Sequence, residues 1–108
     1  MSDKVEIQIQ SASLTQLPRT MTAAPSLMAE VAADNAYVGR TVEDGKGGMN
    51  PRWLEKFPVP ASCQRIRFTV YIKGFVGHTP CGEGLADMQA VLRQGVGNVQ
   101  LLHNGVSV

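Results

Sequence analysis

Hydrophobic and polar side chains alternate without a break along residues 65–73. The apolar positions are Ile66, Phe68, Val70 and Ile72, and the polar positions are Arg65, Arg67, Thr69, Tyr71 and Lys73. A β-strand repeats every two residues, whereas a helix would scatter both sets around its axis. The pattern therefore predicts a strand over residues 64–75, with one face in a core and a basic, hydroxyl-bearing face outside it.

Weaker patterns predict further strands. Residues 4–10 alternate in the same way, and their apolar positions are Val5, Ile7 and Ile9. Shorter strands are expected at residues 36–42, 98–103 and 106–108. The last two would be joined by Asn104-Gly105, because this dipeptide favours the tight turn of a β-hairpin.

Helical spacing is clearest at residues 85–94, where the apolar face consists of Leu85, Met88, Val91 and Leu92. Shorter helices are expected at residues 25–35 and 51–57, since each begins at a proline, which suits the first turn of a helix. Glycine and proline punctuate residues 74–84, and this segment is interpreted as a loop. Residues 11–24 have no clear period and are expected to form a long irregular arm or loop.

Together these elements predict an α+β fold. A small, mostly antiparallel or mixed sheet would carry the amphipathic helix 85–94 packed on one of its faces. The opposite face of the sheet, with the polar residues of the central strand, would stay open. At 108 residues the chain is expected to be a single domain, residues 1–108, with one modest core.

Composition removes several function classes. The formal net charge of +1 gives no bulk attraction to nucleic acid or to a membrane surface. No apolar run approaches the roughly 20 residues that span a bilayer, and no apolar signal-peptide core precedes the first strand. We therefore expect a cytoplasmic protein, or a virion component if the source is viral, without a membrane partner.

The open strand face is the first candidate site. Cations for phosphates and a ring for base stacking are what sheets offer to RNA or single-stranded DNA. Nucleic-acid binding through the basic face 65–73 is therefore one hypothesis, and its residues would be Arg65, Arg67, Thr69, Tyr71 and Lys73. An ordinary solvated sheet face and a surface for an acidic protein are the alternatives.

The cysteines and histidines form the second candidate site. They are Cys63, His78, Cys81 and His103. Two cysteines and two histidines are a legitimate zinc set, but structural zinc sites usually draw their ligands as two close pairs, which these spacings do not supply. Cys81 is also a candidate nucleophile, because a position just before a helix lowers a thiol pKa. The preferred interpretation is that neither cysteine is a ligand, and no metal or cofactor is expected.

No catalytic set accompanies the long irregular segment 11–24. The leading hypothesis is therefore a non-enzymatic assembly or partner-binding protein, a homo-oligomer or a subunit with a protein partner, such as a small viral coat or virion protein. Nucleic-acid binding by the face 65–73 and a zinc-binding or cysteine-dependent protein centred on Cys81 are the alternatives. The first two hypotheses are compatible, because a coat subunit can also bind RNA.

Overall fold

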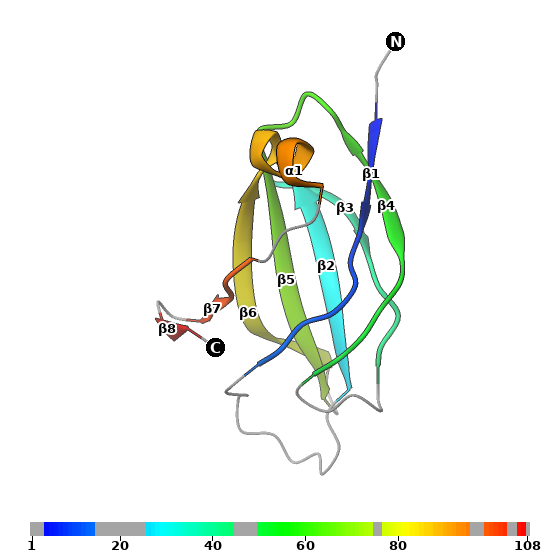
Figure 1. Cartoon of the computed structure of the whole chain (residues 1–108). Coiled ribbons are helices and arrows are strands. Elements are labelled where there is room, and N and C mark those ends of the chain that lie inside the picture. Colours follow the sequence, from blue (N-terminus) through cyan, green and yellow to red (C-terminus); the bar gives the residue numbers. More distant parts are fainter. Residues whose placement is uncertain are drawn as a thin grey trace.

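Two antiparallel β-sheets make up most of the part of the chain that the structure describes (Figure 1). We obtained a computed structural model, which describes residues 4–14, 26–44, 50–74, 77–95, 99–103 and 106–107. The smaller sheet pairs β1 (Lys4–Gln8) with β4 (Lys56–Pro60). The larger sheet has six strands in the order β3 (Ala36–Arg40), β2 (Leu27–Ala33), β5 (Arg65–Gly74), β6 (Gly77–Asp87), β7 (Leu102–His103) and β8 (Val106–Ser107).

One hydrophobic core lies between the two sheets. Every second residue of β2 points into it, and so do the apolar residues of β5. The smaller sheet contributes Phe57 and Val59 from β4, and Trp53 lies just before that strand. The smaller sheet therefore acts as the second layer of a sandwich, and β4 contacts both β2 and β3.

The two-faced central strand is confirmed. β5 lies between β2 and β6, with Ile66, Val70 and Ile72 at most 2% exposed and Phe68 packed against the core. The alternate residues, from Arg65 to Lys73, are half-buried or exposed on the opposite face. The core side and the open side of the larger sheet are thus those that the alternation predicts.

The predicted α+β class is wrong, because strands dominate and the single helix among the described residues does not cover the sheet. Helix α1 (Met88–Gln94) has seven residues and buries only Met88. The predicted helix 85–94 begins three residues late because residues 85–87 pair with β5, and the Asp87 carboxylate accepts from the Ala90 amide to cap the helix there. As a result Leu85 and Leu92 are 56% and 53% exposed.

The predicted helix 25–35 is also wrong, since its residues form strand β2 and a tight turn. Alanine at positions 29, 32 and 33 hides the alternation of the strand, but burial between the sheets decides the structure. Asp34 and Asn35 have φ values of 47° and 70°, the left-handed conformation that two-residue hairpin turns need. Asp34 also accepts hydrogen bonds from the amides of Gln64 and Arg65.

The predicted helix 51–57 is extended chain that leads into β4. Its amide and carbonyl groups bond across to the segment after β1, as in the bond from the Trp53 amide to the Gln10 carbonyl. The Ile9 amide donates to the Glu55 carbonyl. In an antiparallel pair every second residue points its amide toward the partner strand, so the amides of Phe57 and Val59 point toward β1. Pro58 and Pro60 fall at the intervening positions, where the missing N–H is not needed.

The predicted loop 74–84 is the strand β6, which pairs with β5 along its whole length. Glycine is required within this strand at Gly84, because a Cβ there would lie 2.6 Å from the Gln100 carbonyl oxygen. Residues 99–101 therefore cross directly over β6, and Leu101 packs against the core. The glycine that suggested a loop is what allows the chain to cross.

The remaining strand predictions are confirmed with shifted ends. Residues 4–10 contain β1 (4–8), residues 36–42 contain β3 (36–40), residues 98–103 contain β7 (102–103), and residues 106–108 contain β8 (106–107). β7 and β8 pair antiparallel as predicted, while the turn at 104–105 lies outside the described residues. Of the predicted arm, residues 11–14 are described and Leu14 is buried in the core; the rest lies outside the described residues.

Candidate functional site

The side of the larger sheet that points away from the core is the candidate site, and we name it the outer face. Residues paired across neighbouring antiparallel strands project to the same side of a sheet, so the register of the strands identifies its members. They are Arg65, Arg67, Thr69, Tyr71 and Lys73 on β5; Met28, Glu30 and Ala32 on β2; Tyr37 and Arg40 on β3; His78, Pro80, Glu83, Leu85 and Asp87 on β6; and Leu102 on β7.

Two cross-strand rows organise the middle of the outer face. The first row runs over β3, β2, β5 and β6 through Tyr37, Ala32, Arg67 and Leu85. The second row runs over the same strands through Arg40, Glu30, Thr69 and Glu83, and it continues to Leu102 on β7. The first row is thus uncharged except for Arg67, and the second row is charged except for Thr69 and Leu102.

All the polar residues of β5 that the sequence singles out lie together on the outer face, but the face is not basic. Glu30 and Glu83 lie on either side of Thr69, and Asp87 is opposite Arg65. The carboxylates come from the neighbouring strands β2 and β6, whose pairing with β5 is not readable from the local pattern of 65–73. The sequence reasoning therefore found the cations of this face and missed the acids between them.

The charges of the outer face affect the pKa of Tyr71. Partial burial raises the pKa of its hydroxyl, the negative charges of Glu30 and Glu83 raise it further, and Arg67 opposes them. Met28 lies opposite Tyr71 in the register and is only 3% exposed, although it does not belong to the core between the sheets. The tyrosine ring and this methionine thus give the outer face a half-buried apolar region.

Large hydrophobic side chains are exposed on the same face. Tyr37 is 63% exposed, Leu85 is 56% exposed and Leu102 is 44% exposed. Arg67 lies between Ala32 and Leu85 in the first row, and its guanidinium donates to the side-chain oxygen of Asn35 in the β2–β3 turn. That bond holds the arginine beside the exposed apolar residues instead of leaving it free to extend into solvent.

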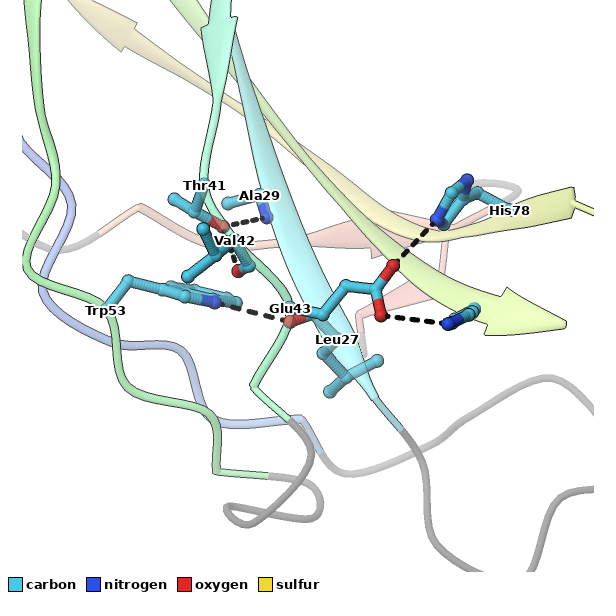
Figure 2. A network of polar contacts seen from close by, with 8 residues as sticks. Leu27, Ala29, Thr41, Val42, Glu43, Trp53 and His78 are labelled. Atoms are coloured by element: carbon cyan, nitrogen blue, oxygen red, sulfur yellow. Dashed lines mark hydrogen bonds and ion pairs between the residues drawn. The ribbon is translucent and has the colours of Figure 1, made fainter.

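At one end of the outer face the carboxylate of Glu43 contacts both Lys73 and His78. Glu43 follows β3, and its two carboxylate oxygens lie 3.5 Å from Lys73 Nζ and 3.2 Å from His78 Nε2. The hydrogen bond from His78 is the largest cause that lowers the pKa of Glu43, and Lys73 adds to it against a smaller desolvation effect. Figure 2 shows Glu43 extending toward His78 on β6, away from the core side of its own segment.

A buried polar cluster fixes the segment that carries Glu43 (Figure 2). The Thr41 hydroxyl accepts from the Ala29 amide at 3.0 Å and donates to the Val42 carbonyl at 2.9 Å. The indole of Trp53 donates to the Leu27 carbonyl at 3.2 Å. Backbone hydrogen bonds from Thr41 to Ala29 and between Asp44 and Leu27 tie residues 41–44 to β2. The position of Glu43 is therefore set by the neighbouring backbone and not by its own exposed side chain.

The cysteines and histidines are not assembled into a site. Cys63 and Cys81 are both free and buried, and Cys81 lies within β6 instead of just before a helix. Burial raises the pKa of the Cys81 thiol to about 11, which opposes the thiolate that a nucleophile or a zinc ligand needs. His78 pairs with Glu43, and the side chain of His103 lies outside what the structure describes. No three His, Cys, Asp or Glu side chains among the described residues are grouped to hold a metal.

No helix within the described ranges is both long and apolar enough to cross a membrane. No protein-family profile matches the sequence, and no curated protein is significantly similar to it. Solved structures do resemble its fold. A C2 domain-containing protein, from a gene described as elicitor-responsive, aligns with a TM-score of 0.71 at 14% identity, covering 98% of this chain and 81% of its own. A second C2 domain structure aligns with a TM-score of 0.60 at 17% identity, covering 76% and 72%. The chain therefore has a β-sandwich fold similar to that of C2 domains.

Proposed function

We propose that this chain is a non-catalytic binding module that contacts another polypeptide through the outer face of its larger sheet. The observation that carries the proposal is the exposure of Tyr37, Leu85 and Leu102 on one face around Arg67. Tyrosine and arginine are enriched in protein interfaces, and exposed apolar side chains gathered on one face are typical of surfaces that bind. The C2-like fold of the solved neighbours is consistent with a binding domain.

The charges of the outer face favour a polypeptide over a nucleic acid. Arg40, Arg65, Arg67 and Lys73 are balanced there by Glu30, Glu43, Glu83 and Asp87. A phosphate backbone would have to pass the carboxylates of β2 and β6 on both sides of β5, which repel it. RNA or single-stranded DNA binding stays a hypothesis that the absorbance ratio at 260 and 280 nm of natively purified protein checks.

The absence of catalysis is part of the same proposal. The Cys81 thiol is buried with a raised pKa, and the two cysteines are separate core residues. Among the described residues, the polar side chains of the outer face carry opposite charges, and the ion pairs that Glu43 makes there are at the surface. A binding surface needs only these exposed groups, whereas a catalyst would need one of them desolvated and oriented.

Site-specific photo-crosslinking tests the proposal. A benzophenone side chain replaces Tyr37 on the outer face, and a matched control carries it at Leu54, which is 75% exposed and lies beside β1 in the smaller sheet. Illumination in the native extract should join the Tyr37 position to a polypeptide, and excess wild-type protein should compete. Excess Leu85→Asp protein should compete poorly, because a charge at that position repels the apolar partner surface.

Three results would contradict this proposal. Crosslinks of equal yield and identity from the Tyr37 and Leu54 positions would show that the outer face is not selective. Undiminished competition by Leu85→Asp protein that keeps a wild-type circular dichroism spectrum would remove the exposed leucine from the contact. A crosslinked product that nuclease degrades would identify nucleic acid as the ligand.

A further inference from the structure

The charges of the outer face are arranged in stripes, one strand at a time. β3 carries Arg40, β2 carries Glu30, β5 carries the cations from Arg65 to Lys73, and β6 carries Glu83 and Asp87. Since the larger sheet runs in the order β3, β2, β5, β6, the sign reads positive, negative, positive, negative across it. Reversing the strand order exchanges the signs, so the outer face is complementary in charge to a second outer face with its strands in the reverse order.

From this arrangement we infer that the polypeptide bound by the outer face is a second copy of this chain, related by a two-fold axis that runs parallel to the strands midway between β2 and β5. The inference rests on the proposed function. A rotation about this axis reverses the strand order, so β2 of one copy faces β5 of the other, and β3 faces β6. Every negative stripe then meets a positive one, in an isologous interface of the commonest oligomer symmetry.

The residues that this axis brings together within each row are compatible with one another. Because the axis is parallel to the strands, residues of one row face residues of the same row in the other copy. In the second row Arg40 faces Glu83 of the other copy, and the contact occurs twice by symmetry. In the first row the exposed ring of Tyr37 faces the exposed Leu85. The apolar contact and the ion pair thus come from neighbouring rows at the same two strands.

The residues at the centre of the interface are also compatible with the proposed two-fold axis. Ala32 faces Arg67 of the other copy, and a small side chain there leaves room for a guanidinium. Glu30 lies two residues from Ala32 along β2, a step of about 7 Å, which is within reach of that arginine. Packed sheets cross at about 30° because of their twist, so the rows match best near the axis, where these residues lie.

The size of the face sets the expected affinity. Strand spacing and rise give four strands of seven paired residues an area on the order of 500 Å² per copy. Stable protein complexes usually bury about 800 Å² per partner, so this dimer should be weak, with a dissociation constant in the micromolar range or above. Weak association of a balanced face is consistent with the near-zero net charge of the chain, +1, which hardly repels a second copy.

Charge reversal tests the axis. Sedimentation velocity is measured from about 10 µM to about 1 mM, the range that brackets weak interfaces, for wild-type protein, Arg40→Glu, Glu83→Arg and the double variant. Each single reversal places like charges together twice, and should raise the dissociation constant about tenfold or more. The double variant restores both pairs. An equimolar mixture of the two single variants should also dimerise, because the reversed residue of one copy then faces the reversed residue of the other, and the two unreversed residues face each other.

Lys56→Glu is the matched control, since Lys56 pairs with Glu6 on the smaller sheet and lies away from the outer face. It should leave the dissociation constant unchanged. A wild-type protein that stays monomeric throughout this range would overturn the inference, and so would a dimer that neither single reversal weakens or that the mixture fails to restore. Crosslinking from the Tyr37 position to a different polypeptide, with the purified chain monomeric, would overturn the second copy as partner and leave the proposed function standing.

Discussion

The aromatic ring of Phe57 on β4 lies directly over Gly39 of β3. A Cβ atom at position 39 would be 2.8 Å from the Cδ1 atom of Phe57, closer than carbon atoms approach without displacement. The contact joins the two sheets, because Phe57 belongs to the smaller one and Gly39 to the larger one. Glycine is therefore required at this position by the space that a neighbouring side chain occupies.

Gly39→Ala should lower the free energy of unfolding by about 1–3 kcal/mol, the usual cost of overpacking. Urea denaturation followed by the fluorescence of Trp53, the only tryptophan in the chain, measures it. In a Phe57→Leu background the same alanine should cost much less, since the ring that it meets is gone. An equal cost in both backgrounds would place the strain elsewhere.

Gly84→Ala should act differently, because the obstruction there includes backbone. The added methyl group would meet both Val99 and the carbonyl oxygen of Gln100, the latter at 2.6 Å. We expect residues 99–102 to detach from β6, with a loss of about 1–3 kcal/mol and faster amide hydrogen exchange at Leu101 and Leu102. Adding Val99→Ala should recover only part of the loss, because the carbonyl stays in place. Complete recovery would show that the side chain alone obstructs.

Thr41→Val should destabilise the fold although it preserves the shape of the side chain. Thr41 is 4% exposed, and its hydroxyl is the partner of the Ala29 amide. Valine leaves that buried donor unpaired, which costs about 1–3 kcal/mol. Thermal unfolding measures the loss. Thr79→Val on the exposed part of β6 is the control and should stay within about 0.5 kcal/mol of wild type.

Stability should fall at alkaline pH, and Cys81 should account for much of the fall. Burial raises its folded pKa to about 11 from an ordinary value of 9.0, so the unfolded chain loses this proton first. The stabilising contribution is complete below pH 9 and is lost as the pH rises toward 11. The raised pKa values of Cys63 and Tyr71 act in the same direction.

Cys81→Ala therefore should flatten the dependence of the unfolding temperature on pH between about 8.5 and 11, whatever its offset at neutral pH. Cys63→Ala is the comparison, and it should flatten the profile less because the pKa shift of Cys63 is smaller in its less enclosed position. A profile for Cys81→Ala parallel to that of wild type would contradict the linkage.

The sequence predicts those parts of the fold in which apolar and polar residues alternate along one segment. β5 and β1 show this alternation, because each has one face on the core and one in solvent. β2 does not, because alanine fills both its faces and Met28 is buried on the outer one. Its end was nevertheless marked by Asp34-Asn35, a pair that tolerates positive φ and indicates a hairpin turn as well as a helix end.

The outer face was harder to predict from the sequence than the strands were. The cations of β5 are visible in one stretch of sequence, but Glu30 and Glu83 are far from it along the chain and reach it only through strand pairing. Register depends on contacts between distant residues, which no single sequence displays. The surface that is basic in the sequence pattern is therefore balanced in charge in the structure.

The prolines of β4 have a consequence for how concentrated solutions of this protein behave. Pro58 and Pro60 turn their nitrogen atoms toward the outer border of the smaller sheet, where a third strand would otherwise seek amide hydrogens. A neighbouring strand therefore finds few amide donors along that border, and filament growth from it is hindered by covalent structure instead of by charge. The protection is permanent, because no change of salt or pH can restore a hydrogen that proline lacks.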